Sequence, residues 1–112
     1  MSETARAATG PAAEKPSEDY IAAIRGYLRI TSSSLDGEIV DLINAARDDL
    51  VLGGVLPVRA KDEGDALIKR AVGVYVKAEF GLDNEDSEKY RDSYRELKIR
   101  LLLSDKYTRE EA

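Results

Sequence analysis

Apolar residues recur every three or four positions in four segments of the chain, which is the spacing of one face of an α-helix. This pattern predicts helices over residues 18–29, 35–52, 63–80 and 87–103. Residues 55–61 start with apolar side chains, but one isolated strand would have no pairing partner, so we expect a connector there and no sheet. The expected fold is all-α, a compact bundle of about four helices with extended N- and C-terminal segments.

The ends of the predicted helices carry residues that favour capping. Ser17, Ser34 and Asp62 precede three of the helices, where a side-chain oxygen can accept hydrogen bonds from free backbone N–H groups. Gly53-Gly54 follows the second helix, and glycine readily takes the left-handed conformation that ends a helix. Gly26 lies inside the first helix, where its missing side chain can permit close packing of a neighbour.

The apolar stripes of the four helices define a candidate core. Its members are Ile24, Leu28, Ile39, Leu42, Ile43, Leu50, Leu67, Ile68, Val72, Tyr75, Leu97 and Leu101. In the third helix further apolar residues lie off the stripe, so that this helix is apolar nearly all round. Such a helix is expected either at the centre of the bundle or under another subunit.

The two ends of the chain differ in composition from the helices. Residues 1–16 are rich in Ala, Ser, Thr, Glu and Pro, which predicts a flexible arm or an arm that orders against a partner subunit. Residues 105–112 are expected to be a charged tail with few core-type side chains. Residues 17–104 are then the helical domain.

Charge and composition argue against several functions. The chain has 17 Lys and Arg against 22 Asp and Glu, a net charge of −5, and nonspecific DNA binding depends on cations at phosphates. It has no Cys and no His, so it lacks disulfides, thiolate metal sites and the usual general base near neutral pH. The sequence contains no activated Ser–Lys pair and no phosphate-binding glycine loop, so we predict that the protein is not an enzyme.

The sequence also favours neither a cofactor, a metal ion nor a membrane. The acidic residues of segment 83–88 lack the spacing of a calcium loop, and negative charge at a helix N-terminus explains them. The longest apolar stretch, residues 71–76, is far shorter than the roughly 20 residues that span a bilayer. Residues 1–8 include Glu3 and Arg6 and have no apolar run, so we expect no secretory signal and a soluble, intracellular protein.

Candidate partner contacts lie in the connector and in the tail. Arg59 and Lys61 are either solvated loop residues or contacts to an acidic partner surface or DNA phosphates. Lys106 and Arg109 carry the positive charge of the tail. Tyr107 lies beyond the last predicted helix, and a tyrosine can pack its ring while its hydroxyl stays wet, so we expect it at a partner contact.

A series of short motifs follows a definite order along the chain. The first half contains residues 24–30 (IRGYLRI), Glu38-Ile39 and residues 42–47 (LINAAR). The second half contains Ala71-Val72, residues 75–78 (YVKA), Phe80-Gly81, Tyr90, Tyr94, Leu97-Lys98, Leu101, Leu103-Ser104 and Tyr107. This ordered set, over residues 20–107, resembles the phage head–tail connector proteins of long-tailed phages, also called head-completion or adaptor proteins.

The resemblance implies a compact helical subunit of the virion neck, made in the bacterial cytoplasm, that assembles with itself into a ring, typically dodecameric. It implies the portal protein and a stopper or tail-completion protein as partners, with DNA only as passing cargo and no cofactor or membrane. The N-terminal arm is longer than the family pattern. Two other functions stay open: a small helical regulatory or adaptor protein that binds one protein partner, and a small helical DNA-binding protein, although no predicted helix is strongly basic on one face.

Overall fold

The computed structural model describes residues 15–80 and 85–110, and in these ranges the regular elements are all helices. They are α1 (Glu18–Tyr27), α2 (Asp36–Gly53), α3 (Pro57–Ala60), α4 (Ala66–Glu79), α5 (Ser87–Leu102) and α6 (Asp105–Thr108). The predicted all-α class is confirmed, and α1, α2, α4 and α5 are the four predicted helices. The single-turn helices α3 and α6 lie where a connector and a tail were expected, and the predicted arm lies almost wholly outside the described residues.

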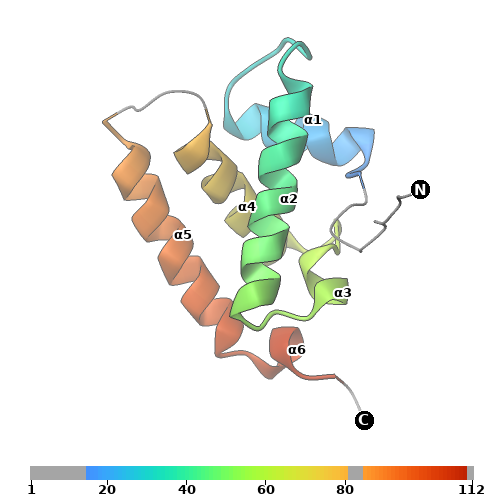
Figure 1. Cartoon of the computed structure of the whole chain (residues 1–112), viewed down its shortest axis with the longest axis vertical. Helices are drawn as coiled ribbons and strands as arrows, with labels where there is room; N and C mark the ends of the chain where they lie inside the picture. Colours follow the sequence, from blue (N-terminus) through green and yellow to red (C-terminus); the bar gives the residue numbers. More distant parts are fainter. Residues whose placement is uncertain (1–14, 81–84, 111–112) are drawn as a thin grey trace, which may run out of the picture.

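Helix α4 occupies the centre of the bundle. It packs against α1, α2 and α5, and Figure 1 shows it behind α2, with α5 alongside and α1 crossing near the upper end. The short helices α3 and α6 lie at the lower end, close to where α2 and α5 finish. The central position explains why α4 is apolar nearly all round, since it has helical neighbours on most of its sides.

Aliphatic side chains of α1, α2 and α4 fill the core, and α5 closes it. Of the candidate core residues, those that the structure buries are Ile24, Ile39, Ile43, Leu50, Ile68, Val72 and Leu101. Leu28, Leu42, Tyr75 and Leu97 are partly buried and pack against the edge of this core. Burial of each large aliphatic side chain contributes about 1.5–3 kcal/mol relative to exposure, so the fully buried set dominates the favourable free energy of folding.

Leu67 departs from the predicted core, because its side chain is 51% exposed. The third helix was predicted to begin at residue 63, whereas α4 begins at Ala66. Leu67 therefore lies in the first turn of α4, where α5 and α6 line the space beside it without covering it.

The helix starts follow the predicted capping chemistry in one case and depart from it in two. The Ser17 hydroxyl accepts a hydrogen bond of 3.1 Å from a backbone N–H of the first turn of α1, as predicted. Asp65, not Asp62, caps α4, and its carboxylate accepts bonds of 2.9 and 3.0 Å from two backbone N–H groups. Ser34 does not cap α2, because Leu35 occupies the capping position and makes no side-chain bond there.

Glycine permits a close contact between α1 and α4, but at a position other than the predicted one. A Cβ atom added to Gly73 would lie 2.8 Å from the ring of Tyr27, so α1 and α4 could not keep this spacing with a larger residue. The same atom added to Gly26 would have no neighbour within 4 Å. Gly54, by contrast, ends α2 as predicted, with a φ of 128° that favours glycine.

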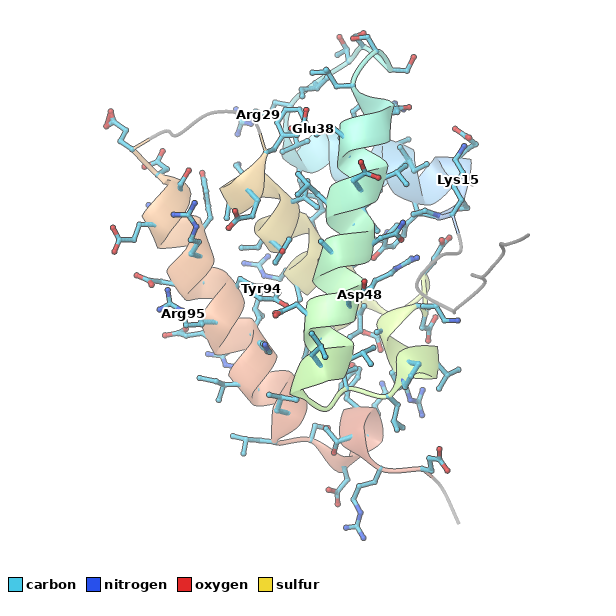
Figure 2. All side chains as sticks on the ribbon, in the orientation of Figure 1. Lys15, Arg29, Glu38, Asp48, Tyr94 and Arg95 are labelled. Carbon is cyan, nitrogen blue, oxygen red and sulfur yellow. The ribbon has the colours of Figure 1, made fainter. Side chains whose placement is uncertain are left out.

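Ionic contacts connect α2 to the helices on either side of it. Arg25 of α1 donates two hydrogen bonds of 2.7 and 3.0 Å to the carboxylate of Asp36. Asp49 of α2 accepts bonds of 2.6 Å from the Tyr94 hydroxyl and 3.0 Å from Lys98 Nζ, and in Figure 2 Tyr94 extends from α5 toward α2. Partial burial raises the pKa of Asp49, but the bonds from Tyr94 and Lys98 outweigh burial and hold the pKa below its usual value.

A buried arginine joins α1, α2 and the turn before α4. Arg47 is only 4% exposed, and its guanidinium lies 5.1 Å from the centre of the Tyr20 ring and 3.5 Å from a Glu63 oxygen. Glu63 also accepts bonds of 3.0 and 2.6 Å from the backbone N–H and the hydroxyl of Ser17. Burial raises the pKa of Tyr20 to about 12, although Arg47 opposes the rise.

Candidate docking surfaces

The described residues gather no group of three or more side chains placed to hold a metal ion. Asp83 and Asn84, part of the acidic segment considered above, lie outside the described residues. The features that distinguish the described surface are exposed apolar side chains and the hollows between them.

Most of the exposed large apolar side chains lie near the ends of α2 and α5, in α3 and at the start of α4, whereas Leu35 lies at the start of α2. The most exposed of them are Leu52, at 86%, and Leu103, at 81%, followed by Val58, Ile99 and Leu67. Leu52 and Ile99 belong to the last turns of α2 and α5, and Leu103 directly follows α5. Val58 lies in α3, and Leu67 lies in the first turn of α4. Helix α3 and the ends of α2 and α5 lie toward the lower end of the bundle (Figure 1). Exposed apolar side chains near one another are candidates for a contact with another protein.

An apolar hollow of about 210 Å³ opens beside Leu67, and we refer to it as the Leu67 hollow. It is lined by Leu67 of α4, by Leu97, Arg100 and Leu101 of α5, and by Ser104 and Tyr107 at α6. Arg100 is its one charged lining residue, and Arg100 makes no ion pair with another described residue. The hollow therefore combines aliphatic walls with a single available positive charge.

Tyr107 forms the inner wall of this hollow and is not the surface contact that was expected. The side chain is 4% exposed, and its hydroxyl donates to the two carboxylate oxygens of Asp65 at 2.9 and 3.2 Å. The backbone N–H of Leu56 donates to the Tyr107 carbonyl oxygen at 2.8 Å, which fixes α6 against the segment before α3. The turn after Ser104 brings Tyr107 back over the core, so this part of the tail is packed.

Asp65 serves as a hydrogen-bond centre beneath Tyr107. Its side chain is 6% exposed, and Lys106 Nζ lies 4.0 Å from it. Burial alone would raise the pKa of Asp65. Hydrogen bonds from the backbone N–H of Ile68, the Tyr107 hydroxyl and the backbone N–H of Leu67 outweigh burial, so that the pKa lies below its usual value. The carboxylate therefore stays ionised and stabilises the start of α4 and the position of α6 together.

Three of the candidate contacts meet in a groove between α3 and α6, which we call the α3–α6 groove. The groove has a volume of about 290 Å³. It is lined by Arg59, Asp105, Lys106, Arg109 and Glu110. Arg109 pairs with Asp105 at 3.6 Å, whereas Arg59 makes no ion pair with another described residue. Lys61 directly follows α3 and does not line the groove.

The exposed face of α2 is acidic. Asp41, Asp48 and Leu52 are exposed and separated by seven and four residues, so they lie along one side of the helix; Asp48 is labelled in Figure 2. The single cation of α2, Arg47, is buried, and Asp49 is held by Lys98. This side of α2 therefore presents carboxylates and a leucine without an exposed basic residue of its own.

Sequence reasoning did not single out the exposed apolar residues Leu52, Ile99 and Leu103, nor Arg100 in the lining of the Leu67 hollow. The available signal was the position of Ile99 and Leu103 off the apolar stripe of the fourth predicted helix, since an apolar residue off the buried stripe needs a second partner. Arg100 carried no comparable signal, because its role depends on the hollow that α4, α5 and α6 enclose.

No described helix is long and apolar enough to cross a membrane. The described chain is a small all-helical bundle, and its described surface is distinguished by exposed apolar side chains and shallow hollows. A family model of phage connector proteins matches residues 21–108, and the chain belongs to this phage connector protein family. The family is structural and its members are head–tail connector components of bacteriophage virions, which confirms the resemblance drawn from the sequence. No curated protein and no solved structure matches the chain.

Proposed function

We propose that this protein is the adaptor between the portal and the stopper or tail of a phage virion, where its copies form a dodecameric ring that continues the DNA channel. The observation that carries the proposal is the family match over residues 21–108, which extends from α1 to the end of α6. The protein acts without catalysis: it binds the portal protein on one side and the stopper or tail-completion protein on the other.

The α3–α6 groove is the surface we assign to the portal. Arg59, Lys106 and Arg109 line it, and Arg59 has no acidic partner among the described residues. The exposed Val58 and the partly buried Leu56 line an adjoining open hollow of about 610 Å³. Basic side chains next to aliphatic ones fit a portal segment that carries carboxylates beside an apolar residue.

The charge of the protein suits a channel wall past which DNA moves. A net charge of −5 gives no net attraction to DNA phosphates, so passing DNA is not retained. The buried state of Arg47 leaves the exposed side of α2 without a cation that could hold a phosphate. DNA is then cargo, and the specific partners are proteins.

Binding to purified portal rings tests this proposal. The native chain is expected to bind the portal, and Arg59→Glu is expected to weaken binding because it reverses the available charge of the α3–α6 groove. Lys89→Glu is the matched control, since Lys89 is exposed on the first turn of α5, outside the groove. Failure of the native chain to bind portal rings, or an equal loss in both variants, would contradict the assignment.

The alternative function, a small helical regulatory or adaptor protein with one protein partner, makes a different prediction in the same experiment. A chain of that kind would not bind the portal and would form a complex of one-to-one stoichiometry with a protein that is not a virion component. Mass photometry of the complexes separates the two functions, because a ring on a portal has many copies.

A further inference from the structure

The Leu67 hollow has the chemistry of a receptor for one aliphatic side chain with a carboxylate one helical turn away. Leu67, Leu97, Leu101 and the ring of Tyr107 surround it, and four surrounding residues are what a knob from a facing helix enters. Arg100 stands in the lining without an ion pair to any described residue. The buried carboxylate below, Asp65, is already occupied by Tyr107 and the first turn of α4.

The chain itself carries the complementary group on α2. Leu52 is the most exposed large apolar side chain described, and Asp48 lies one turn before it on the same side of the helix. Asp48 forms no ion pair with another described residue, and Arg47 next to it is buried. The last two turns of α2 thus present a leucine and an unpaired carboxylate about one helical pitch, roughly 5.4 Å, apart.

We infer that copies of this chain contact one another with Leu52 of one copy inserted into the Leu67 hollow of the next, and with Asp48 paired to Arg100 of that next copy. An arginine guanidinium and a carboxylate form a strong, directional pair when the surrounding leucines exclude water. Charge complementarity identifies a second copy as the occupant, because the knob is acidic, the hollow has only a positive charge, and both are on the described surface of one chain.

The contact is head-to-tail. The residues that line the Leu67 hollow come from α4, α5 and the segment at α6, and none comes from α2. The two surfaces therefore differ, and each copy offers both, so that successive copies continue in one direction until the rotation closes a ring. Closure into a ring rests on the proposed function, whereas the contact between two copies does not.

Disulfide trapping tests the contact directly, because the natural chain has no cysteine. Leu52→Cys and Leu67→Cys are prepared as separate single-cysteine proteins of different mass, mixed at high concentration and oxidised. Both positions are exposed, so the fold should be retained, and circular dichroism checks this. The expected product is the mixed dimer, formed several-fold faster than with Leu35→Cys in place of Leu52→Cys, since Leu35 is exposed at the opposite end of α2.

Charge reversal then tests the ionic half of the contact. Asp48→Arg in the Leu52→Cys protein should lower the rate of mixed-dimer formation several-fold, and Arg100→Asp in the Leu67→Cys partner should restore it. A mixed dimer that forms no faster than with the Leu35→Cys control would overturn the inference, as would a predominant dimer of Leu52→Cys with itself or a rate that charge reversal leaves unchanged. Trapping of the contact in a chain that does not bind portal rings would contradict the proposed function and leave the contact in place.

Discussion

Gly73→Ala would insert a methyl group into a close contact between α1 and α4. The added Cβ would lie 2.8 Å from two ring carbons of Tyr27 and 2.9 Å from a third, distances that real Cβ atoms essentially never show. Gly73 is also in a helix interior, where alanine is favoured over glycine by about 1 kcal/mol. The substitution therefore combines a gain in helix propensity with a steric cost, and the two must be separated.

Gly26→Ala is the matched substitution that provides the separation. Gly26 is also helical, in α1, and its Cβ position has no neighbour within 4 Å, so only the gain in propensity applies there. Overpacking of a core costs about 1–3 kcal/mol. We therefore expect Gly73→Ala to be less stable than Gly26→Ala by about 1–3 kcal/mol, the steric cost alone, with Gly26→Ala equal to or more stable than the natural chain.

Urea unfolding followed by circular dichroism measures the free energy of unfolding of both variants. The dependence of this free energy on urea concentration must be equal for the two, so that a difference in midpoint reports a difference in stability. Tyr27→Ala removes the obstructing ring, and in that background Gly73→Ala should no longer be destabilising, which is a double-mutant test of the contact. The reasoning is refuted if Gly73→Ala and Gly26→Ala have the same free energy of unfolding, because the packing of α1 on α4 would then not require glycine.

Three further predictions concern the core and the tail. Tyr107→Phe should lower the free energy of unfolding by about 1.5–3 kcal/mol, since a hydrogen bond to the charged Asp65 is lost, and thermal melting would show no change if α6 were loose. Ile43→Asp should unfold the domain by burying an unpaired charge, whereas Leu52→Asp should leave the circular dichroism spectrum unchanged. A normal melting curve for the Ile43 variant would contradict the burial of this face of α2. Burial favours the neutral phenol of Tyr20, so the stability it contributes should be fully present below its unfolded pKa near 10 and be lost as the pH rises through about 12. Urea titrations at increasing pH should show a smaller loss of stability for Tyr20→Phe than for the natural chain, and an equal loss would exclude Tyr20 as the cause.

The long helices were predictable because each repeats its apolar spacing over three or more turns. The central place of α4 was one of two placements that the sequence allowed, since residues 71–76 are apolar on nearly every side and could equally have been covered by another subunit. The short helices α3 and α6 were not predictable by this route, because four residues make a single turn and display no period. Capping residues fixed the start of α1 at Ser17 but not the start of α4, where Asp62 and Asp65 are equally suitable by type.

The docking surfaces were less accessible to sequence reasoning than the fold. The grouping of Arg59 with Lys106 and Arg109 depends on the Tyr107–Leu56 backbone bond, a contact between segments about fifty residues apart in sequence that no local pattern indicates. Tyr107 itself was expected at the surface because a lone tyrosine in a charged segment has no apolar neighbours to signal burial. The role of its partner Asp65 could not be predicted either, because Tyr107 is distant from Asp65 in the sequence.

Electron cryomicroscopy of the phage particle that contains this chain is the most direct test of the proposed function. The account predicts a closed ring of copies directly below the portal, each with the α1–α6 fold and with the DNA channel passing through its centre. An adaptor ring at the portal that is built from another protein, with this chain absent from the head–tail junction, would contradict the account.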